Sequence, residues 1–389
     1  MAEMIPRSDG DEERKVSASE SLCDELIFKI FIQVPPKTVF RSKCVCKSWK
    51  TMFSDKSFLK RAKAIPLPPL IVGFFSSNLD RKDKRIDFYE IISNSAQVVM
   101  DTRFRFLQEP IIVVSSHDGL VLCEKMKDGG GGGYIVCNPL THQLVNLPRP
   151  KWKINLAPQF YMKCMDLFCY NKTSDEVQFD FTVVSLLIVD SNDFLIEIYS
   201  SETGEWTSIR KIPCDFPNFK PTTIRLFSYE SFYLLDIDYR QLCIYNWKEK
   251  TSHFIALPIV VGADNIQTRT GVLGLSSESL LYYAEKSSFL LNVWVLVEGV
   301  KWSLIQRIRN NILKDQFPGT RKERYELRLL CFHPTNCNIV LVRFGLGGDV
   351  FLYHIDDGQV ELLKDSAQRV LDKAVPYSLP AWPPCIRKN

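Results

Sequence analysis

Residues 22–49, LCDELIFKIFIQVPPKTVFRSKCVCKSW, decide how the first part of the chain folds, because hydrophobic residues recur there at helical spacing until two prolines interrupt them. The stripe of this expected helix that faces its core consists of Leu22, Leu26, Ile30 and Val34, widened by Cys23, Ile27 and Phe31. Phe28 and Ile32 lie outside the stripe. The sequence therefore predicts a helix that ends at Pro35 and Pro36.

Three further short helices are predicted after the prolines. Two cover residues 37–44 and 45–52, and Ser54 and Asp55 begin another, while the proline-rich residues 66–69 form a linker. A helical unit of roughly 45 residues has a thin core and usually needs a staple, a metal or a partner. We therefore expect this unit to bury some of its hydrophobic residues against another chain.

A partner face would explain three residues of the helical unit. Phe28 and Ile32 lie off the stripe, and Trp49 ends a helix of mixed polarity. Aromatic side chains at the centre of such a face often dominate the binding free energy. The alternative is that Trp49 belongs to the core and that the unit packs on the rest of the chain.

From residue 70 onward, short runs rich in Val, Ile, Phe and Tyr alternate with polar turns, a pattern typical of β-strands. The runs expected to be strands are 70–75, 111–114, 120–123, 134–137, 179–189, 194–199, 232–237, 242–245, 280–284, 289–297, 339–344 and 350–354. Residues 365–373 are the best candidate for a helix in this part.

A strand–turn–strand unit recurs in this β-rich part. Its copies, whose starts are 46 to 62 residues apart, are 134–148, 196–206, 242–254, 291–302 and 350–362. This spacing is close to the ~40–50 residues of a propeller blade, with insertions in loops. The expected fold class is a small α-helical module followed by an all-β, propeller-like domain of short antiparallel strands. The alternative is a pair of non-repeating β-sandwiches.

Composition narrows the class of protein. The 389 residues include 49 Lys and Arg and 45 Asp and Glu, a formal net charge of +4 that does not indicate nucleic-acid binding. No stretch approaches the ~20 apolar residues of a membrane span. Residues 1–18 are polar, are expected to form a disordered lead-in, and lack the apolar region of a secretory signal. The 12 cysteines are therefore expected as free thiols in the cytoplasm and/or nucleus.

Residues 22–49 resemble the F-box, especially its plant form, which begins Leu-Pro-x-(Asp/Glu)-Leu and closes with Val-Cys-Lys-x-Trp. Residues 43–49, KCVCKSW, match the closing motif, whereas Cys23 stands where the family usually has proline. Residues 117–123, HDGLVLC, and 137–141, CNPLT, are similar to the opening motifs of the F-box-associated, kelch-like domain found in the same family.

This resemblance implies a function without catalysis or a cofactor. F-box proteins bind a small Skp-family adaptor, which links them to a cullin and its RING subunit, while a C-terminal domain holds a protein substrate. The likeness assigns residues 19–65 to the F-box module and 70–389 to a substrate-recognition domain. Carried over residue by residue, the adaptor contacts are Leu22, Leu26, Ile27, Ile30, Pro35, Val45, Cys46 and Trp49. The substrate and the residues that bind it stay unidentified.

Cysteine spacing gives weak signals for metal sites. Cys44 and Cys46 lack the Cys-x-x-Cys spacing of a metal or redox pair, so we expect two buried helix cysteines. Cys331, His333 and Cys337 are slightly similar to a zinc-ligand pattern, but a strand followed by a turn explains them better.

Glycine-containing segments also have ordinary explanations. Asp118-Gly119 after His117 predicts a hairpin turn instead of a catalytic dyad. The glycine runs 129–133 and 345–348 lack the residues and the following helix of phosphate-binding or dinucleotide-binding loops.

Two other functions stay open. One is a β-propeller enzyme or glycan-binding lectin, which carboxylates or aromatic residues converging in the central channel would favour. The other is an F-box protein that acts as a scaffold outside the ligase.

Overall fold

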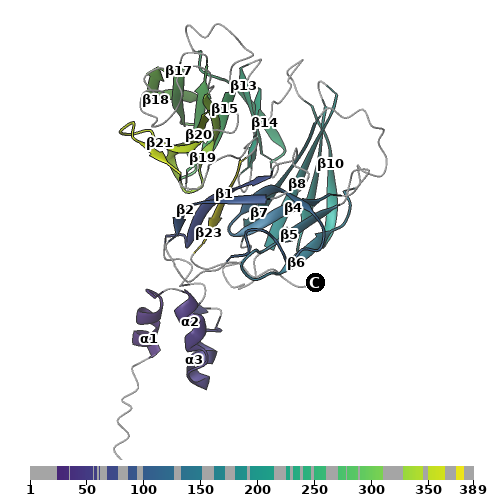
Figure 1. The fold of residues 1–389 in the computed structure, drawn as a ribbon. Helices are drawn as coiled ribbons and strands as arrows, with labels where there is room; N and C mark the ends of the chain where they lie inside the picture. Colours follow the sequence, from purple (N-terminus) through teal and green to yellow (C-terminus); the bar gives the residue numbers. More distant parts are fainter. Residues whose placement is uncertain are drawn as a thin grey trace, which may run out of the picture. The chain divides into compact units, whose positions relative to one another are not determined.

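The computed structural model describes the following residues: 24–34, 36–55, 57–58, 61, 68–77, 86–93, 100–126, 133–150, 162–170, 180–190, 193–213, 225–227, 231–236, 240–246, 249–259, 270–276, 278–287, 290–309, 327–344, 349–363 and 374–380. The chain divides into two compact units, Met1–Ile65 and Pro66–Asn389. The first contains the helices and the second contains the strands (Figure 1). No helix in the described part of the chain is long and apolar enough to cross a membrane.

The first unit contains the helices α1 (Asp24–Phe31), α2 (Pro36–Ser42) and α3 (Lys47–Met52). Helix α1 ends before the prolines, at Phe31, where the expected helix continued to Val34. The turn that follows is tightened by a hydrogen bond from the Gln33 N–H to the Ile30 carbonyl at 3.2 Å. A residue directly before proline avoids the helical conformation, which explains the earlier end.

Rings from three segments form the core of the helical unit. Phe31 packs on Trp49 and Phe53, with ring centroids 4.9 Å and 4.5 Å apart. Phe58 lies 5.1 Å from both Phe28 and Phe53. Phe53 and Phe58 are almost completely buried, so these contacts exclude water from the centre of the unit.

The core-facing side of α1 differs from the expected stripe. Phe28 and Ile32 are already buried, Phe28 against Phe58, so the expectation that a partner face covers them was wrong. Leu26 and Ile30, expected toward the core, are exposed. Phe28 packs instead on Phe58, which in turn packs on Phe53. Both of these rings lie outside residues 22–34, so the helical periodicity of that segment could not include them.

Asp55 precedes the helical residues Ser57 and Phe58, in agreement with the helix start predicted at Ser54 and Asp55. Its Oδ1 accepts hydrogen bonds from the backbone N–H of Ser57, at 2.8 Å, and from the Ser57 hydroxyl. These bonds lower the pKa of the Asp55 carboxyl, because they favour its charged form.

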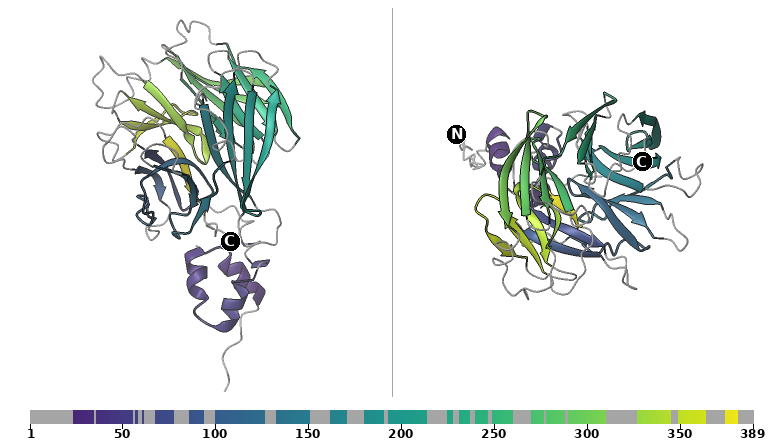
Figure 2. Two further views of the ribbon diagram at one scale, coloured as in Figure 1. Left: turned by 90° about the vertical axis from the view of Figure 1, so that its right-hand side faces the viewer. Right: turned by 90° about the horizontal axis from the view of Figure 1, so that it is seen from above.

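The second unit is a six-bladed β-propeller of antiparallel sheets (Figures 1 and 2). Its sheets, in strand order, begin with β2-β1-β23, formed by β1 (Ile71–Ser77), β2 (Ile86–Ser93) and β23 (Ala374–Leu379). Next come β3 (Ile111–His117), β4 (Leu120–Lys125), β5 (Tyr134–Cys137) and β6 (Leu144–Leu147). The third sheet contains β7 (Met162–Tyr170), β8 (Asp180–Asp190), β9 (Asp193–Ser200) and β10 (Glu205–Pro213).

The other three sheets follow the same order. They are β11 (Arg225–Phe227), β12 (Ser231–Asp236), β13 (Gln241–Asn246) and β14 (Thr251–Ala256); β15 (Thr270–Leu275), β16 (Leu281–Lys286), β17 (Leu290–Val297) and β18 (Lys301–Arg309); and β19 (Leu327–His333), β20 (Asn336–Phe344), β21 (Val350–His354) and β22 (Val360–Leu362). In the view from above, the sequence colours run around this unit from sheet to sheet (Figure 2).

The recurring sequence unit marks the same part of five blades. Its copies form the hairpins β5–β6, β9–β10, β13–β14, β17–β18 and β21–β22, which are the third and fourth strands of each four-stranded sheet. The predicted propeller is thus confirmed, and the sandwich alternative is wrong. The candidate helix at 365–373 lies outside the described residues.

The ring is closed by strands from both ends of the unit. The late strand β23 pairs with β1, and it also contacts β3 and β19, the first strands of the two neighbouring sheets. It thus occupies the first-strand position of a blade whose other strands, β1 and β2, come at the start of the unit. Hydrophobic clusters fill the spaces between sheets, and one of them joins Phe74 of β1 to Leu341 of β20.

Two tryptophans connect neighbouring blades through hydrogen bonds. The Trp206 Nε1–H donates to the Pro148 carbonyl at 2.8 Å, and the Trp302 Nε1–H donates to the Ala256 carbonyl at 3.1 Å. Each tryptophan is the second residue of a fourth strand, and each acceptor lies at or just after the end of the fourth strand of the preceding blade. In these two copies of the repeat, the tryptophan therefore helps to hold neighbouring blades together.

Candidate functional site

Helix α1 exposes two large hydrophobic side chains one turn apart. Leu26 is 48% exposed and Ile30 is 50% exposed, and their four-residue spacing places them on one face of the helix. Next to them an exposed ion pair joins Lys29 Nζ to Glu25 Oε1 at 3.9 Å. Hydrophobic side chains of this size are normally withdrawn from water, so this face is a candidate binding surface.

The turn before α3 exposes another hydrophobic residue. Val45 is 66% exposed, and the turn is held by hydrogen bonds from the Val45 N–H to the Ser42 carbonyl at 3.1 Å and from the Cys44 N–H to the Arg41 carbonyl at 3.0 Å. Cys46 caps α3, because its Sγ accepts the Trp49 N–H at 3.4 Å. The backbone thus fixes an exposed Val45 in place.

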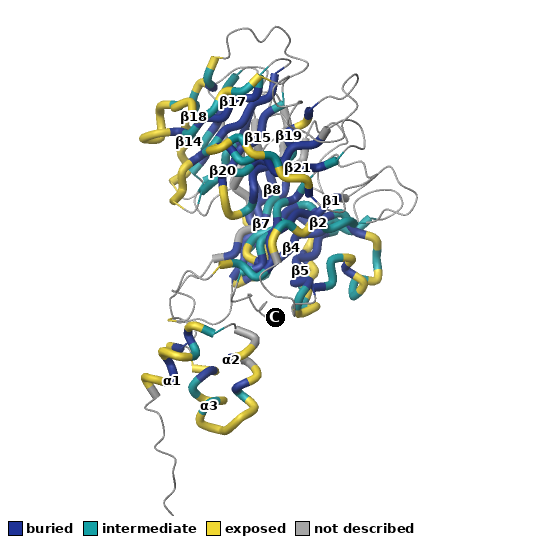
Figure 3. Tube along the Cα trace, turned by 60° about the vertical axis from the view of Figure 1, so that its left-hand side comes forward, coloured by how far each residue is buried: buried dark blue, intermediate teal, exposed yellow. Residues whose placement is uncertain are grey.

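The predicted adaptor contacts fall into three groups. Leu26, Ile30, Val45 and Cys46 are exposed; Ile27 is buried and Trp49 is half-buried; Leu22 and Pro35 lie outside the described residues. We call the first group, Leu26, Ile30, Val45 and Cys46, the exposed apolar set. Figure 3 shows that exposed residues occur on all three helices, whereas the sheets are mostly buried.

The cysteine expectation for this region was wrong. Cys44 and Cys46 are exposed free thiols and not buried helix cysteines. They lie in the turn and at the cap between α2 and α3, because the helices are shorter than the predicted 37–44 and 45–52. Both thiols are therefore accessible beside Val45.

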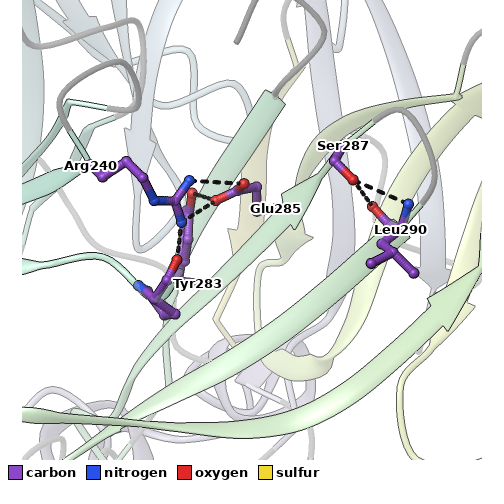
Figure 4. Close-up of polar contacts among 6 residues, drawn as sticks. Arg240, Tyr283, Glu285, Ser287 and Leu290 are labelled. Carbon is purple, nitrogen blue, oxygen red and sulfur yellow. Dashed lines mark hydrogen bonds and ion pairs between the residues drawn. The ribbon is translucent and has the colours of Figure 1, made fainter. Parts of the chain in front are cut away.

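In the propeller, a buried ion pair joins two neighbouring blades (Figure 4). The Arg240 guanidinium binds both carboxylate oxygens of Glu285, with Nη1–Oε1 and Nη2–Oε2 distances of 3.2 Å, and it also donates to the Pro258 carbonyl. The Tyr283 hydroxyl donates to Glu285 Oε2 at 2.5 Å. Arg240 lies in the turn between β12 and β13, and Glu285 lies on β16 of the next blade. The two charged groups pair with each other, so they serve to join blades, although the Arg240 Nε–H has no hydrogen-bond partner among the described residues.

The candidate zinc residues lie at the β19–β20 turn. Burial raises the pKa values of the Cys331 and Cys337 thiols to about 12, and burial with the nearby His354 lowers the His333 pKa to about 4. In the described residues no group of three or more His, Cys, Asp or Glu side chains is arranged to hold a metal ion. Burial thus favours neutral Cys331 and Cys337 thiols and a neutral His333 imidazole, whose buried Nε2 has no hydrogen-bond partner in the part of the chain that the structure describes.

The Asp118-Gly119 hairpin turn is confirmed. Both residues have positive φ angles, 46° for Asp118 and 80° for Gly119, and they connect β3 directly to β4. This is the backbone that a two-residue hairpin turn requires. The neighbouring His117 accepts the Cys169 N–H through Nδ1 at 3.3 Å, which links β3 to β7. The glycine run 345–348 and most of 129–133 lie outside the described residues.

Comparisons with known proteins match both units. The family model described as "F-box protein At3g26010-like, beta-propeller" matches residues 87–342, and the F-box domain model matches residues 19–61. The curated relatives include F-box protein At5g03970 of Arabidopsis thaliana, 23% identical over 95% of this chain and 89% of the relative. F-box protein At5g49610 of the same plant is 23% identical over 76% of this chain and 81% of the relative.

Among solved structures, TolB from Acinetobacter baumannii is 12% identical over 83% of this chain and 70% of its own, with a TM-score of 0.43. That likeness is too distant to bear on function. The family match covers more than half of the chain and includes strands of all six blades. Together with the F-box match over the helices, it shows that this chain belongs to the F-box proteins with an At3g26010-like β-propeller.

Proposed function

We propose that this chain is the substrate-recognition subunit of a Skp-cullin-F-box ubiquitin ligase in the cytoplasm and/or nucleus. The helical unit would bind a Skp-family adaptor, and through it a cullin, while the propeller would bind a protein substrate. The family membership supports the adaptor and the substrate as classes of partner. The chain itself would carry no catalytic group, since holding a substrate near a charged conjugating enzyme raises its effective concentration.

The observation that carries the proposal is the exposed apolar set on the surface of a helical unit that has its own aromatic core. The aromatic core is complete without Leu26, Ile30 and Val45. Covering these three side chains would remove apolar surface from water, and each fully buried side chain contributes roughly 1.5–3 kcal/mol. A partner that covers them therefore gains binding free energy without unfolding the unit.

The buried members of the predicted contacts would act differently. Ile27 is buried and cannot contribute much surface to an adaptor, so its role is to hold α1 in position. Trp49 packs on Phe31 and Phe53, and it would present only its exposed part. Leu26, Ile30 and Val45 are thus the contacts we expect to dominate.

Co-purification of the full chain with a Skp-family adaptor and a cullin tests the proposal. Leu26→Asp should abolish adaptor capture, because it places a charge in a face that becomes desolvated on binding. The variant should keep its fold, since Leu26 is outside the core. Leu144→Asp, at a propeller leucine that is 41% exposed, is the matched control and should capture the adaptor normally.

The outcomes separate the alternatives. Capture of the adaptor without a cullin would indicate a scaffold outside the ligase. Capture of neither, by a folded chain, would refute the ligase proposal. Equal capture by Leu26→Asp and the unchanged chain would refute the assignment of the α1 surface.

A further inference from the structure

The outer strand β18 forms a long edge of its sheet. It is one of the fourth strands of the propeller, and among the described strands it pairs only with β17 (Figure 1). It spans nine residues, as the outer strand β10 also does, whereas the fourth strands β6, β14 and β22 span four, six and three. The outward backbone groups of a long edge strand can pair with an added strand.

Hydrophobic side chains along this edge face water. Leu304 is 43% exposed and Ile305 is also exposed, and Val300 in the preceding turn is 71% exposed. Ile305 forms a bulge, because the register passes from the Trp294–Leu304 pair to the Val293–Gln306 pair. The extra residue leaves Leu304 and Ile305 adjacent and both accessible.

The positive charge along β18 indicates which kind of strand could pair with it. Lys301, Arg307 and Arg309 are exposed, and the strand sequence KWSLIQRIR contains no acidic residue. A second copy paired edge to edge would bring these cations together, which is unfavourable for cross-strand neighbours. An acidic strand would instead place opposite charges beside them.

We propose that the β18 edge binds an extended acidic segment of a partner protein, with alternating acidic and hydrophobic residues, as a fifth strand of the sheet β15-β16-β17-β18. As a statement about the substrate class, this inference rests on the proposed function of the chain. Backbone hydrogen bonds to the edge would supply affinity. Contacts with Leu304, Ile305 and the three cations would supply selectivity.

Fluorescence anisotropy with the full chain and short labelled peptides tests this binding directly. The probe is a peptide of alternating glutamate and valine whose length matches β18. One control peptide replaces glutamate with lysine, and another keeps the glutamates but is N-methylated along its backbone. We expect the glutamate peptide to bind roughly tenfold more tightly than either control peptide. Increasing the salt concentration should weaken this binding.

A charge reversal on the protein sharpens the test. The double variant Lys301→Glu with Arg309→Glu changes exposed side chains at the two ends of β18, so thermal unfolding should stay unchanged. It should bind the glutamate peptide roughly tenfold more weakly and the lysine peptide more tightly. The matched control, Arg103→Glu with Arg105→Glu, reverses two exposed cations in the segment before β3 and should bind like the unchanged chain.

The result that would overturn the inference is equal binding of the glutamate and lysine peptides, or binding that survives both the reversal and N-methylation. No measurable binding of any peptide would also overturn it. Because the assay needs no adaptor, its failure is distinct from a failure of adaptor capture. A chain that captures the adaptor but not the peptide keeps the proposed function and loses only this edge as its substrate site.

Discussion

The helical unit and the propeller keep hydrophobic surface from water in different ways. In the propeller, clusters between neighbouring sheets bury side chains such as Val340, Leu242 and Leu120 completely. The helical unit has an aromatic core of a few rings and leaves Leu26, Ile30 and Val45 exposed. A unit this small cannot bury all of its hydrophobic side chains in its own core, so the remaining ones are available to a partner. The comparison predicts that single core substitutions act locally in each unit.

The largest effect is expected from Phe53→Ala in the helical unit. Phe53 is completely buried and contacts the rings of Phe31, Trp49 and Phe58. Its truncation should destabilise this unit by about 3–5 kcal/mol, which is most of what a small unit has. Circular dichroism should show loss of helix while the propeller transition keeps its midpoint.

Ile30→Ala is the matched control for Phe53→Ala, because Ile30 is exposed on the same unit. It should change the free energy of unfolding by less than about 0.5 kcal/mol. If Phe53→Ala left the helices intact, the aromatic core would not be what holds them together.

A smaller effect is expected from Gly274→Ala between two blades of the propeller. An added Cβ on Gly274 of β15 would lie 2.6 Å from the ring of Phe332 on β19. Relieving this overlap should cost about 1–3 kcal/mol and lower the propeller's unfolding midpoint without affecting the helices. Urea unfolding followed by tryptophan fluorescence would measure it.

A smaller ring should relieve the Gly274→Ala overlap. Adding Phe332→Leu to Gly274→Ala should cost less than the sum of the two single variants, because they change one contact. Strictly additive costs would show that the overlap is not the cause.

The smallest effect concerns pH and His333. Its folded-state pKa of about 4 lies below its ordinary value of 6.5, so between these values the unfolded chain binds more protons than the folded chain. The stability of the propeller should therefore fall as pH decreases from about 6.5 toward 4, by about 1 kcal/mol at pH 5.5 from this group alone. Urea midpoints at pH 7 and 5.5 would measure it. His333→Gln should remove that part of the pH dependence, and an unchanged dependence would contradict the assignment.

The sequence predicted the blades because their middle strands are nearly continuous hydrophobic runs. In the sheet β3-β4-β5-β6 the middle strands β4 and β5 have continuous buried stretches, such as Val121–Cys123, whereas burial alternates along β3 and only Leu147 of β6 is buried. Strand β19 was predicted only as a strand before the turn at His333, without bounds, since Arg328 breaks its pattern and its burial depends on β15 and β23 from distant parts of the chain. The repeat copy 291–302 includes only the first two residues of the edge strand β18. The sequence of a strand does not by itself show which strands will pair with it.

The sequence named the residues of the candidate surface, but it did not predict which side of α1 faces the solvent. Helix α1 has hydrophobic residues around most of its circumference, so periodicity could not decide between Leu26 and Phe28 as the buried side chain. Phe53 and Phe58 decide it, and they lie more than a helix length away in sequence. The motif resemblance assigned Leu26, Ile30 and Val45 to the adaptor contacts without that information, and all three are exposed in the structure, but their role as contacts stays a prediction.

The position of β23 in the ring has a consequence for biosynthesis. Residues 374–379 complete a blade that was begun by residues 71–77, so the ribosome must release nearly the whole chain before the circle can close. Until then Phe74 and Phe75 of β1 lack one flank, and the nascent propeller is an open arc that chaperones would need to shield. A premature stop codon shortly before residue 374 would leave that arc open permanently, although every other blade had been translated.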